Sequence, residues 1–456
     1  VGLVHTLLKG VHITQHTTPP TLKDGNKTVF VNGTYHPNAD IDQHNGALMI
    51  TRGDEIWAWT DAGRMYRTEF DPKRDLVGHV PMHMPFVTHN QAPRVSFYCN
   101  MAKQAMAAQQ PNYAPVCHRL VYAQAPALKP AHDDTAGCNV ILAINAMGWN
   151  QEDSLAIAQG ALDRGLFRSM EYKTYHMPIA GQATDDTIDT DGIACEGTQK
   201  ETGDTLVATE AGKATVLPRS APKVTVDEAY IMPAEKKAMV RTVAMRTPVV
   251  GDKFTSRYAQ KGTIAIVVPD ENMPFTKDGI RPDMVINPHA FPSRMTVGQI
   301  MEMAGAKINV IHAKHTVDGT PLNETHTMQQ LKNELHTAGH ASSGKERMYS
   351  GTTGAMLPEP IFIAPCWYQR LTHLAQEKCY ARGSTGPVDM ITRQPTNGRK
   401  KNGGMRLGEM EKDVLLSHGA PHVLQARANS IGSDTFQGAN MPHATALLMK
   451  ELNAML

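Results

Sequence analysis

The chain has 456 residues, of which 41% are hydrophobic, and its 45 lysines and arginines nearly balance its 44 aspartates and glutamates. This composition supports a sizeable core spread over several domains. It argues against a strongly basic, free-standing nucleic-acid binder, so basic groups that bind phosphates must be clustered. No run of about eighteen apolar residues occurs and the N-terminus lacks the apolar core of a signal peptide, so we expect a soluble intracellular protein.

The cysteines are widely spaced. All six are separated by more than three residues, which excludes a Cys-x-x-Cys zinc ribbon and gives no sign of a disulfide framework. Because the chain begins with Val1 rather than Met, we expect a fragment or a processed piece.

Two patterns near the N-terminus imitate metal sites. His12 and His16 have the spacing of ligands on a helix, but no glutamate accompanies them. Residues 38–42 carry two aspartates without a third acid. Since Mg²⁺ prefers more carboxylates than this, we interpret residues 38–42 as a polar loop.

Residues 89–106 predict an extended segment followed by a helix rich in alanine and methionine. Pro93 keeps Ala92 out of the helical region and places Arg94 near the helix start. Arg94 is there either a phosphate ligand or a residue that merely caps a surface turn.

Residues 140–144 predict a buried strand, and the adjacent carboxylates of Glu152 and Asp153 follow it. Negative charge at the end of a strand is typical of sites on sheets. If the strand continues, the two side chains point to opposite sides, so only one can face a given metal.

Residues 175–246 are rich in threonine, aspartate and glycine, and their weak periodicity predicts a short-stranded β insertion. Residues 251–262 then carry three cations, Lys253, Arg257 and Lys261, with Asp252 as the only acid. They lie between β-branched runs at 247–250 and 263–268, which predicts a basic, glycine-bounded loop framed by strands. Two point charges and one planar fork suit a phosphate chain, although many basic loops are only solvated surface.

Residues 296–306 predict a helix with apolar residues at 297, 300, 301 and 304. Ser293 is a natural N-cap for it, which would hold Arg294 rigidly at the edge of the helix. Further along, glycines separate Arg393, Arg399 and Arg406, so that a flexible backbone could follow a phosphate chain.

The motifs at 90–106, 148–169, 251–296 and 391–413 together resemble the second-largest subunit of multisubunit DNA-dependent RNA polymerases, of the eukaryotic and large-DNA-virus type, over roughly residues 50 to 456. The resemblance implies a mixed α/β subunit with a β-barrel core of double-psi type that binds the RNA–DNA hybrid, and a reduced wall. The domains it implies are an external-type remnant at 1–88, hybrid-binding parts at 89–174 and 247–430, the second including a switch segment, the reduced wall at 175–246, and a truncated clamp-side helix at 431–456.

The implied reaction is nucleotidyl transfer with two Mg²⁺ ions, for which this chain alone would be inactive because the largest subunit holds the first metal. The resemblance assigns the RNA 3′ end and the nucleotide to Lys253 and Lys261, the triphosphate to Arg94 and Arg294, and the second Mg²⁺ to Glu152 and Asp153. It assigns contacts with nucleic acid to Gln91, Lys103, Gln104, Arg257, Arg393, Arg399 and Arg406.

The implied partners are the largest subunit, small assembly subunits, template DNA, nascent RNA and nucleoside triphosphates, without a membrane. The implied location is the nucleus or, for a viral protein, the host cytoplasm or virion. Only residues 437–441 stand where cellular members carry a zinc ribbon, so we expect no structural zinc.

Two alternatives remain. Tyr258 and Ala259 replace the usual His-Gly pair of the family, which would fit a non-catalytic nucleic-acid-binding or assembly module. Phe97 replaces a usual tyrosine of the family, so a hydroxyl contact is not expected there. The 21 histidines are the sole argument for a metal-dependent hydrolase.

Overall fold

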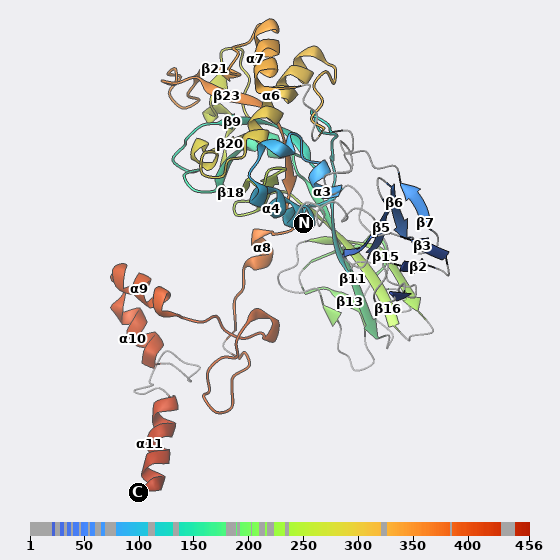
Figure 1. Cartoon of the computed structure of the whole chain (residues 1–456). Helices are drawn as coiled ribbons and strands as arrows, with labels where there is room; N and C mark the ends of the chain where they lie inside the picture. Colours follow the sequence, from blue (N-terminus) through green and yellow to red (C-terminus); the bar gives the residue numbers. More distant parts are fainter. Residues whose placement is uncertain are drawn as a thin grey trace. The chain divides into compact units, whose positions relative to one another are not determined.

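The computed structural model describes residues 79–107, 115–130, 136–178, 188, 192–201, 203–208, 215–216, 223–232, 237–320, 326–383, 385–429 and 443–456, together with seven strands between residues 21 and 68. The chain divides into two compact units, Val1–Ala375 and Gln376–Leu456 (Figure 1). The division after residue 375 falls inside the region 247–430, and the domain boundaries drawn from the sequence stay predictions.

The first strands form two small antiparallel sheets. One contains β1 (Thr21–Leu22), β2 (Thr28–Val31) and β3 (Thr34–Pro37), and the other contains β4 (Asp40–His44), β5 (Ala47–Arg52), β6 (Glu55–Trp59) and β7 (Met65–Thr68). The prediction of a polar loop at 38–42 was wrong for Asp40 and Asp42, which pair with Thr51 and Met49 in a strand ladder. His12, His16 and the segment 433–441 lie outside the described residues.

A closed six-stranded barrel is the centre of the first unit. Its strands, in order around the barrel, are β17 (Lys253–Ser256), β18 (Lys261–Val268), β10 (Ser154–Ala158), β20 (Met284–Ile286), β9 (Cys138–Ile144) and β23 (Ile361–Arg370). The β17–β23 pairing closes the ring, and β21 (Lys345–Glu346) extends it beside β23. Two of its pairings, β10–β18 and β20–β9, are parallel. The sequence correctly predicted the strands at 140–144 and 263–268, whereas residues 247–250 form no strand.

Apolar side chains from these strands, including Leu142, Leu155, Ile157, Phe254 and Ile264, fill the core. Their burial is the main force that holds the barrel together. The helix α6 (Val297–His312) packs against β23, and α7 (Met328–Thr337) packs against α6.

The first unit also contains a five-stranded antiparallel sheet. Its order is β12 (Gln199–Lys200), β15 (Val224–Met232), β16 (Lys237–Arg246), β11 (Ser169–Pro178) and β8 (Val116–Leu120). The prediction of short strands for 175–246 was wrong for β15 and β16, which are 9 and 10 residues long, whereas β12 has 2 residues. Two-stranded pairs are formed by β13 (Thr205–Val207) with β14 (Thr215–Val216), and by β19 (Phe275–Thr276) with β22 (Met348–Tyr349).

The buried Arg370 ties this sheet to the barrel through hydrogen bonds. Arg370, at the end of β23, pairs with Asp252 at 2.7 Å, and both side chains are 1% exposed. The same guanidinium donates to the backbone carbonyls of Phe167 and Arg246 and to the Ser169 hydroxyl at 2.9–3.1 Å. Phe167 and Ser169 thus supply buried contacts to the end of β23.

The remaining described helices are short. In the first unit they are α3 (His79–Met82), α4 (Ala92–Ala102), α5 (Gln159–Asp163), and the 3-10 helices η2 (Val87–His89), η3 (Asp270–Asn272) and η4 (Pro288–Ala290). At the division between the units lies α8 (Ala375–Lys378). The second unit contains η5 (Arg399–Lys401), α9 (Glu409–Ser417), α10 (Pro421–Asn429) and α11 (His443–Met455). None of the helices in the described part of the chain is long and apolar enough to cross a bilayer.

Candidate functional site

One rim of the barrel carries a small pocket. Its lining includes Asp153, Gln260, Lys261, Gly262, Asn287 and Arg294. Gly262 allows a close approach of β18 to the loop before β10, because a Cβ there would lie in tight contact, 3.1 Å from the backbone oxygen of Asp153. We call Arg94, Asp153, Gln260, Lys261 and Arg294 the rim site.

Arg294 is held in place by protein contacts. One of its Nη atoms donates to Gln260 Oε1 at 2.7 Å, and the other forms an ion pair with Asp153. Gln260 is itself fixed, because its Nε2 donates to Thr296 Oγ1 at 2.7 Å and to the Ala290 carbonyl at 3.1 Å. The Arg294 side chain is 18% exposed, so the fork keeps access to solvent while its geometry is preorganised.

The backbone that carries Arg294 is fixed in a different way from the one predicted. Thr296, and not Ser293, occupies the N-cap position of α6, and its side chain does not cap the helix. Instead, Met295 adopts a left-handed φ of 51° and donates its N–H to the Phe291 carbonyl at 2.9 Å. A tight turn therefore presents Arg294.

Asp153 and Glu152 do not lie on a continuing strand. Strand β9 ends at Ile144, and both carboxylates precede β10, where Asp153 has a left-handed φ of 49°. The buried Asn150 shapes the intervening loop by donating to the Asn145 carbonyl at 2.9 Å. The condition for the predicted alternation, a strand that continues through both carboxylates, is therefore not met, and the loop turns Asp153 toward Arg294 and leaves Glu152 exposed.

Arg94 joins this group from α4. Arg94 lies in the first turn of the helix, as the sequence predicted, but the helix begins at Ala92, so the prediction that Pro93 keeps Ala92 out of the helical region was wrong. Burial and the positive charge of Arg294 lower the pKa of Arg94, and the carboxylate of Asp153 opposes that effect. Two arginines thus share the field of one aspartate, and the guanidinium of Arg94 also lies 5.5 Å from the ring centre of Phe97.

The two lysines come from the β17–β18 hairpin. Thr255 lies opposite Lys261 and Lys253 lies opposite Thr263. Because residues opposite each other share a face and side chains alternate along a strand, Lys253 and Lys261 lie on the same face, away from Phe254. Lys261 is exposed and lines the pocket, while Lys253 is half-buried.

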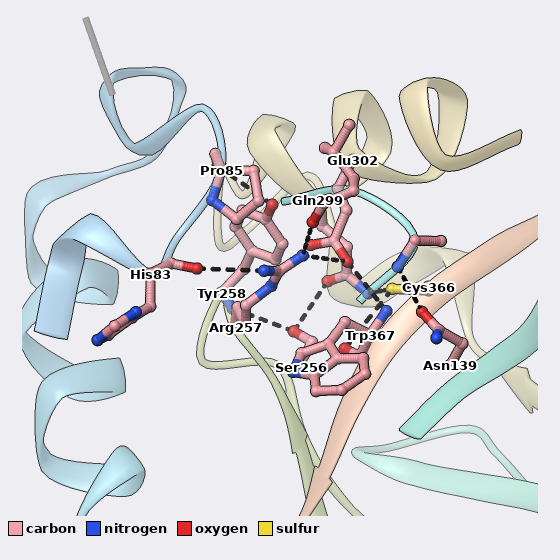
Figure 2. A network of polar contacts seen from close by, with 12 residues as sticks. His83, Pro85, Asn139, Ser256, Arg257, Tyr258, Gln299, Glu302, Cys366 and Trp367 are labelled. Carbon is pink, nitrogen blue, oxygen red and sulfur yellow. Dashed lines mark hydrogen bonds and ion pairs between the residues drawn. The ribbon is translucent and has the colours of Figure 1, made fainter. Parts of the chain in front are cut away.

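The predicted basic loop is corrected at Arg257. Its side chain is fully buried, and it forms an ion pair with Glu302 of α6 at 3.0 Å. It also donates to the carbonyls of His83 and Leu128 at 3.2 and 3.0 Å (Figure 2). In this arrangement Arg257 cannot contact nucleic acid, and Asp252 neutralises Arg370 rather than the neighbouring cations.

The other candidates for nucleic-acid contacts lie at the two ends of α4 and in the second unit. Gln91 is the N-cap residue of α4. Lys103 and Gln104 follow the C-terminal end of this helix and are exposed. Gln104 forms a hydrogen bond with His373 at 2.8 Å. Arg393, Arg399 and Arg406 are exposed residues of the second unit.

Sequence reasoning missed Gln260 and Thr296, which orient Arg294. Neither is charged, and no spacing rule marks such an orienting residue. The single available signal was that Gln260 directly precedes Lys261 in the basic segment.

The fold and the rim site define a class, namely a closed β-barrel that gathers arginine, lysine and carboxylate side chains where a polyanion and a cation can meet. A family model described as RNA polymerase Rpb2, domain 6, matches residues 80–401. The chain therefore belongs to the Rpb2 family, that of the second-largest subunit of RNA polymerase.

Similar proteins have the same affiliation. DNA-directed RNA polymerase II subunit 2 of Arabidopsis thaliana is 35% identical over 77% of this chain and 34% of its own length. The RPB2 subunit of RNA polymerase II from Schizosaccharomyces pombe is 36% identical over 82% of this chain and 34% of its own length. The RPC2 subunit of RNA polymerase III from Drosophila melanogaster is 32% identical over 91% of this chain and 43% of its own length. The chain thus spans well under half the length of these relatives.

Proposed function

We propose that this chain serves DNA-templated RNA synthesis as the part of a multisubunit RNA polymerase that contacts nucleotide phosphates, the RNA 3′ end and the RNA–DNA hybrid. In this reaction the RNA 3′ hydroxyl attacks the α-phosphate of a nucleoside triphosphate and pyrophosphate leaves. The observation that carries the proposal is the preorganised fork of Arg294, held between Gln260 and Asp153 beside Arg94.

The rim site suits a triphosphate on physical grounds. A planar guanidinium can donate to two phosphate oxygens at once, and a fork already fixed by the protein loses little freedom on binding. Arg94, Lys261 and Arg294 supply three positive charges, which would stabilise the negative charge that develops on the phosphates in the transition state. Lys253 shares the hairpin face of Lys261 and would extend this field toward the RNA 3′ end.

The two carboxylates fit a role beside magnesium. Glu152 and Asp153 offer exposed oxygen ligands, which is the ligand type that Mg²⁺ prefers, and a few carboxylates together with substrate phosphates are its usual companions. When bound, the ion would supply electrostatic stabilisation of the attacking and leaving oxygens. In the proposal, these residues hold the second Mg²⁺ with the nucleotide, and the largest subunit holds the first.

The proposal extends to partners and location. The largest subunit, small assembly subunits, template DNA and nascent RNA would meet this chain, with Lys103, Gln104, Arg393, Arg399 and Arg406 as candidate contacts to nucleic acid. By analogy with the RNA polymerase II relatives, we place the assembly in the nucleus or, for a viral enzyme, in the host cytoplasm or virion. We expect no structural zinc.

The alternative of a non-catalytic module has lost part of its support. It rested on Tyr258 and Ala259, but both residues are buried beneath the rim and neither faces the pocket. Their replacement therefore does not remove a phosphate ligand, and the retained cations favour the catalytic proposal.

The proposal is tested by Arg294→Lys in a polymerase assembled with its partner subunits. The charge is kept but the fork is lost, so we expect the apparent KM for nucleoside triphosphates to rise about tenfold while hybrid binding stays unchanged. Arg164→Lys is the matched control, since Arg164 pairs with Asp283 at 3.1 Å and its side chain is 67% exposed. Loss of hybrid affinity at constant KM would assign Arg294 to another ligand, and no change in either quantity would mean that its role is structural.

A further inference from the structure

The turn between β17 and β18 reaches two different elements of the first unit. Its residues 257–260 are buried, and Arg257 fixes it to α6 through the ion pair with Glu302 at 3.0 Å. Glu302 also accepts a hydrogen bond from the Trp367 backbone N–H at 2.9 Å, which links the turn to β23 (Figure 2). The turn thus has a rigid base in the barrel wall and in the helix that covers it.

On one side the turn holds the segment that leads into α4. The hydroxyl of Tyr258 donates to the Pro85 carbonyl at 3.1 Å, and Arg257 donates to the His83 carbonyl at 3.2 Å. The ring of Tyr258 belongs to one buried cluster with Met84, Val87 and Tyr98. This segment and helix carry Arg94.

On the other side the turn holds Arg294. Gln260 accepts from Arg294 at 2.7 Å and donates to Thr296 at 2.7 Å. Between Tyr258 and Gln260 lies Ala259, whose left-handed φ of 58° is unusual for a residue with a Cβ. One short turn therefore has a direct hydrogen bond to each of the two elements that present the arginines.

The two elements also touch each other with little free space. Asn90 accepts from the Gly298 N–H at 3.0 Å, and Gln91 donates to the Met295 carbonyl at 3.4 Å. A Cβ at position 298 would lie 2.5 Å from the Asn90 amide and 2.9 Å from the Tyr258 ring. Because such close packing leaves few alternative arrangements, a displacement of the α4 segment is transmitted to the rim.

We infer that Tyr258 is a positioning residue for nucleotide binding, which sets the placement of Arg94 relative to Arg294 through the Pro85 carbonyl. This inference rests on the proposed function. Its physical basis is that two arginines can bind one triphosphate together only when the distance between their guanidinium groups matches the positions of the phosphate oxygens. Small displacements of either arginine therefore weaken binding. Tyr258 itself does not touch the nucleotide.

The first test is Tyr258→Phe in the assembled polymerase, since this variant keeps the ring and its packing and removes only the hydroxyl. We expect the apparent KM for nucleoside triphosphates to rise roughly three- to tenfold, as for the loss of one hydrogen bond. The kcat at saturating nucleotide and the affinity for the hybrid should stay within about twofold of wild type, because the variant removes no group that contacts the reacting atoms or the hybrid. Val240→Ala is the control, because it opens a cavity in the core of the five-stranded sheet, where Val240 is fully buried.

A rise in KM for Tyr258→Phe but not for Val240→Ala supports a positioning role. An unchanged KM, or equal changes in both variants, overturns it and leaves Tyr258 as a packing residue. If Arg294→Lys raises the KM while Tyr258→Phe does not, only this inference fails. If Arg294→Lys has no effect either, the proposed function of the rim site fails as well.

A second variant tests the other end of the same turn. Gln260→Met keeps the side-chain length and removes the hydrogen bond to Arg294, and it should raise the KM in the same way. If both residues act through one rigid turn, the double variant should change the KM by less than the product of the two single changes. Full independence of the two effects would contradict a shared positioning device.

Discussion

The buried interior of the first unit and the rim of the barrel use arginine in opposite ways. Arg370 in the interior is 1% exposed, and it is surrounded by a carboxylate, two backbone carbonyls and a hydroxyl. At the rim, Arg94 and Arg294 share one partly exposed aspartate with the nearby Lys261. Interior arginines are neutralised by the protein, whereas the rim keeps an excess of positive charge, and this difference distinguishes a structural arginine from one that can bind a ligand.

The largest expected effect is on the interior. Arg370→Leu leaves the carboxylate of Asp252 buried without its partner, and three further acceptors lose a donor. We expect a loss of about 3–5 kcal/mol in the free energy of unfolding. Urea denaturation of the isolated chain, followed by tryptophan fluorescence, measures it.

For comparison, the rim change Arg294→Lys should leave the denaturation midpoint of the isolated chain nearly unchanged. A midpoint for Arg370→Leu equal to that of wild type would remove the distinction between the two regions.

The second effect is on the rim and on activity. Lys261→Ala removes one charge from the pocket while the strand that carries it remains paired in the barrel. We expect the barrier for nucleotide addition to rise by about 2–3 kcal/mol, which slows elongation roughly 30- to 150-fold with little effect on assembly. Single-turnover elongation by the assembled polymerase measures this rate.

Lys345→Ala is the control for that variant. Lys345 is likewise an exposed lysine at the first position of a strand in the same sheet, but it does not line the pocket. Normal elongation by the Lys261 variant would count against placing the active site at this rim.

A third, smaller effect concerns pH. Burial raises the pKa of Glu171, but the ion pairs and hydrogen bonds with Lys173 and Arg246 outweigh it and lower the pKa from 4.5 to about 2. A carboxylate with a lowered folded-state pKa contributes stability that is fully present above pH 4.5 and is lost as the pH falls toward 2.

We therefore expect the urea midpoint of the wild type to fall as the pH decreases from 4.5 toward 2. Glu171→Gln should lower the midpoint at neutral pH and make its dependence on pH weaker in this range. The exposed Glu152 offers the control substitution Glu152→Gln, which should leave the slope intact. If the urea midpoint fell equally steeply with decreasing pH in wild type and in Glu171→Gln, other carboxylates would dominate acid unfolding.

The contrast between interior and rim also explains which predictions succeeded. Apolar runs and turn residues predicted β9, β18 and the helix at Val297, because burial of such runs follows from local periodicity. Arg257 and Lys261 looked alike in the sequence, since each is a cation in one basic segment. Their difference depends on Glu302, which is 45 residues further along the chain from Arg257 and therefore invisible to spacing rules.

The same reason accounts for the differences from expectation at the carboxylates and at Ser293. The direction of Asp153 depends on a left-handed φ of 49° and on a loop packed against Asn287, which donates to the Gln151 carbonyl at 2.7 Å. Ser293 is not the cap because a turn from Phe291 to Met295 moves the N-cap position to Thr296 and the first helical residue to Val297. Tertiary contacts decided both features, and local pattern cannot supply them.

The smallest expected effect belongs to the second unit, where Arg393, Arg399 and Arg406 are exposed, whereas Arg94 and Arg294 at the rim are half-buried. Arg406 is exposed and follows a glycine pair that Tyr380 fixes through its hydrogen bond to the Gly403 carbonyl at 2.7 Å.

If Arg406 contacts one phosphate of the hybrid, Arg406→Gln should weaken binding slightly and make the slope of log affinity against log salt shallower by roughly 0.7–0.9. Titration of the assembled polymerase with a labelled RNA–DNA hybrid at several salt concentrations measures this slope, with Arg347→Gln as a control at an exposed arginine of the first unit. Because Arg406 is exposed and is not part of the rim site, its substitution should change neither the stability of the fold nor the KM for nucleotides. An unchanged slope for Arg406→Gln would mean that an exposed arginine outside a pocket is simply solvated surface.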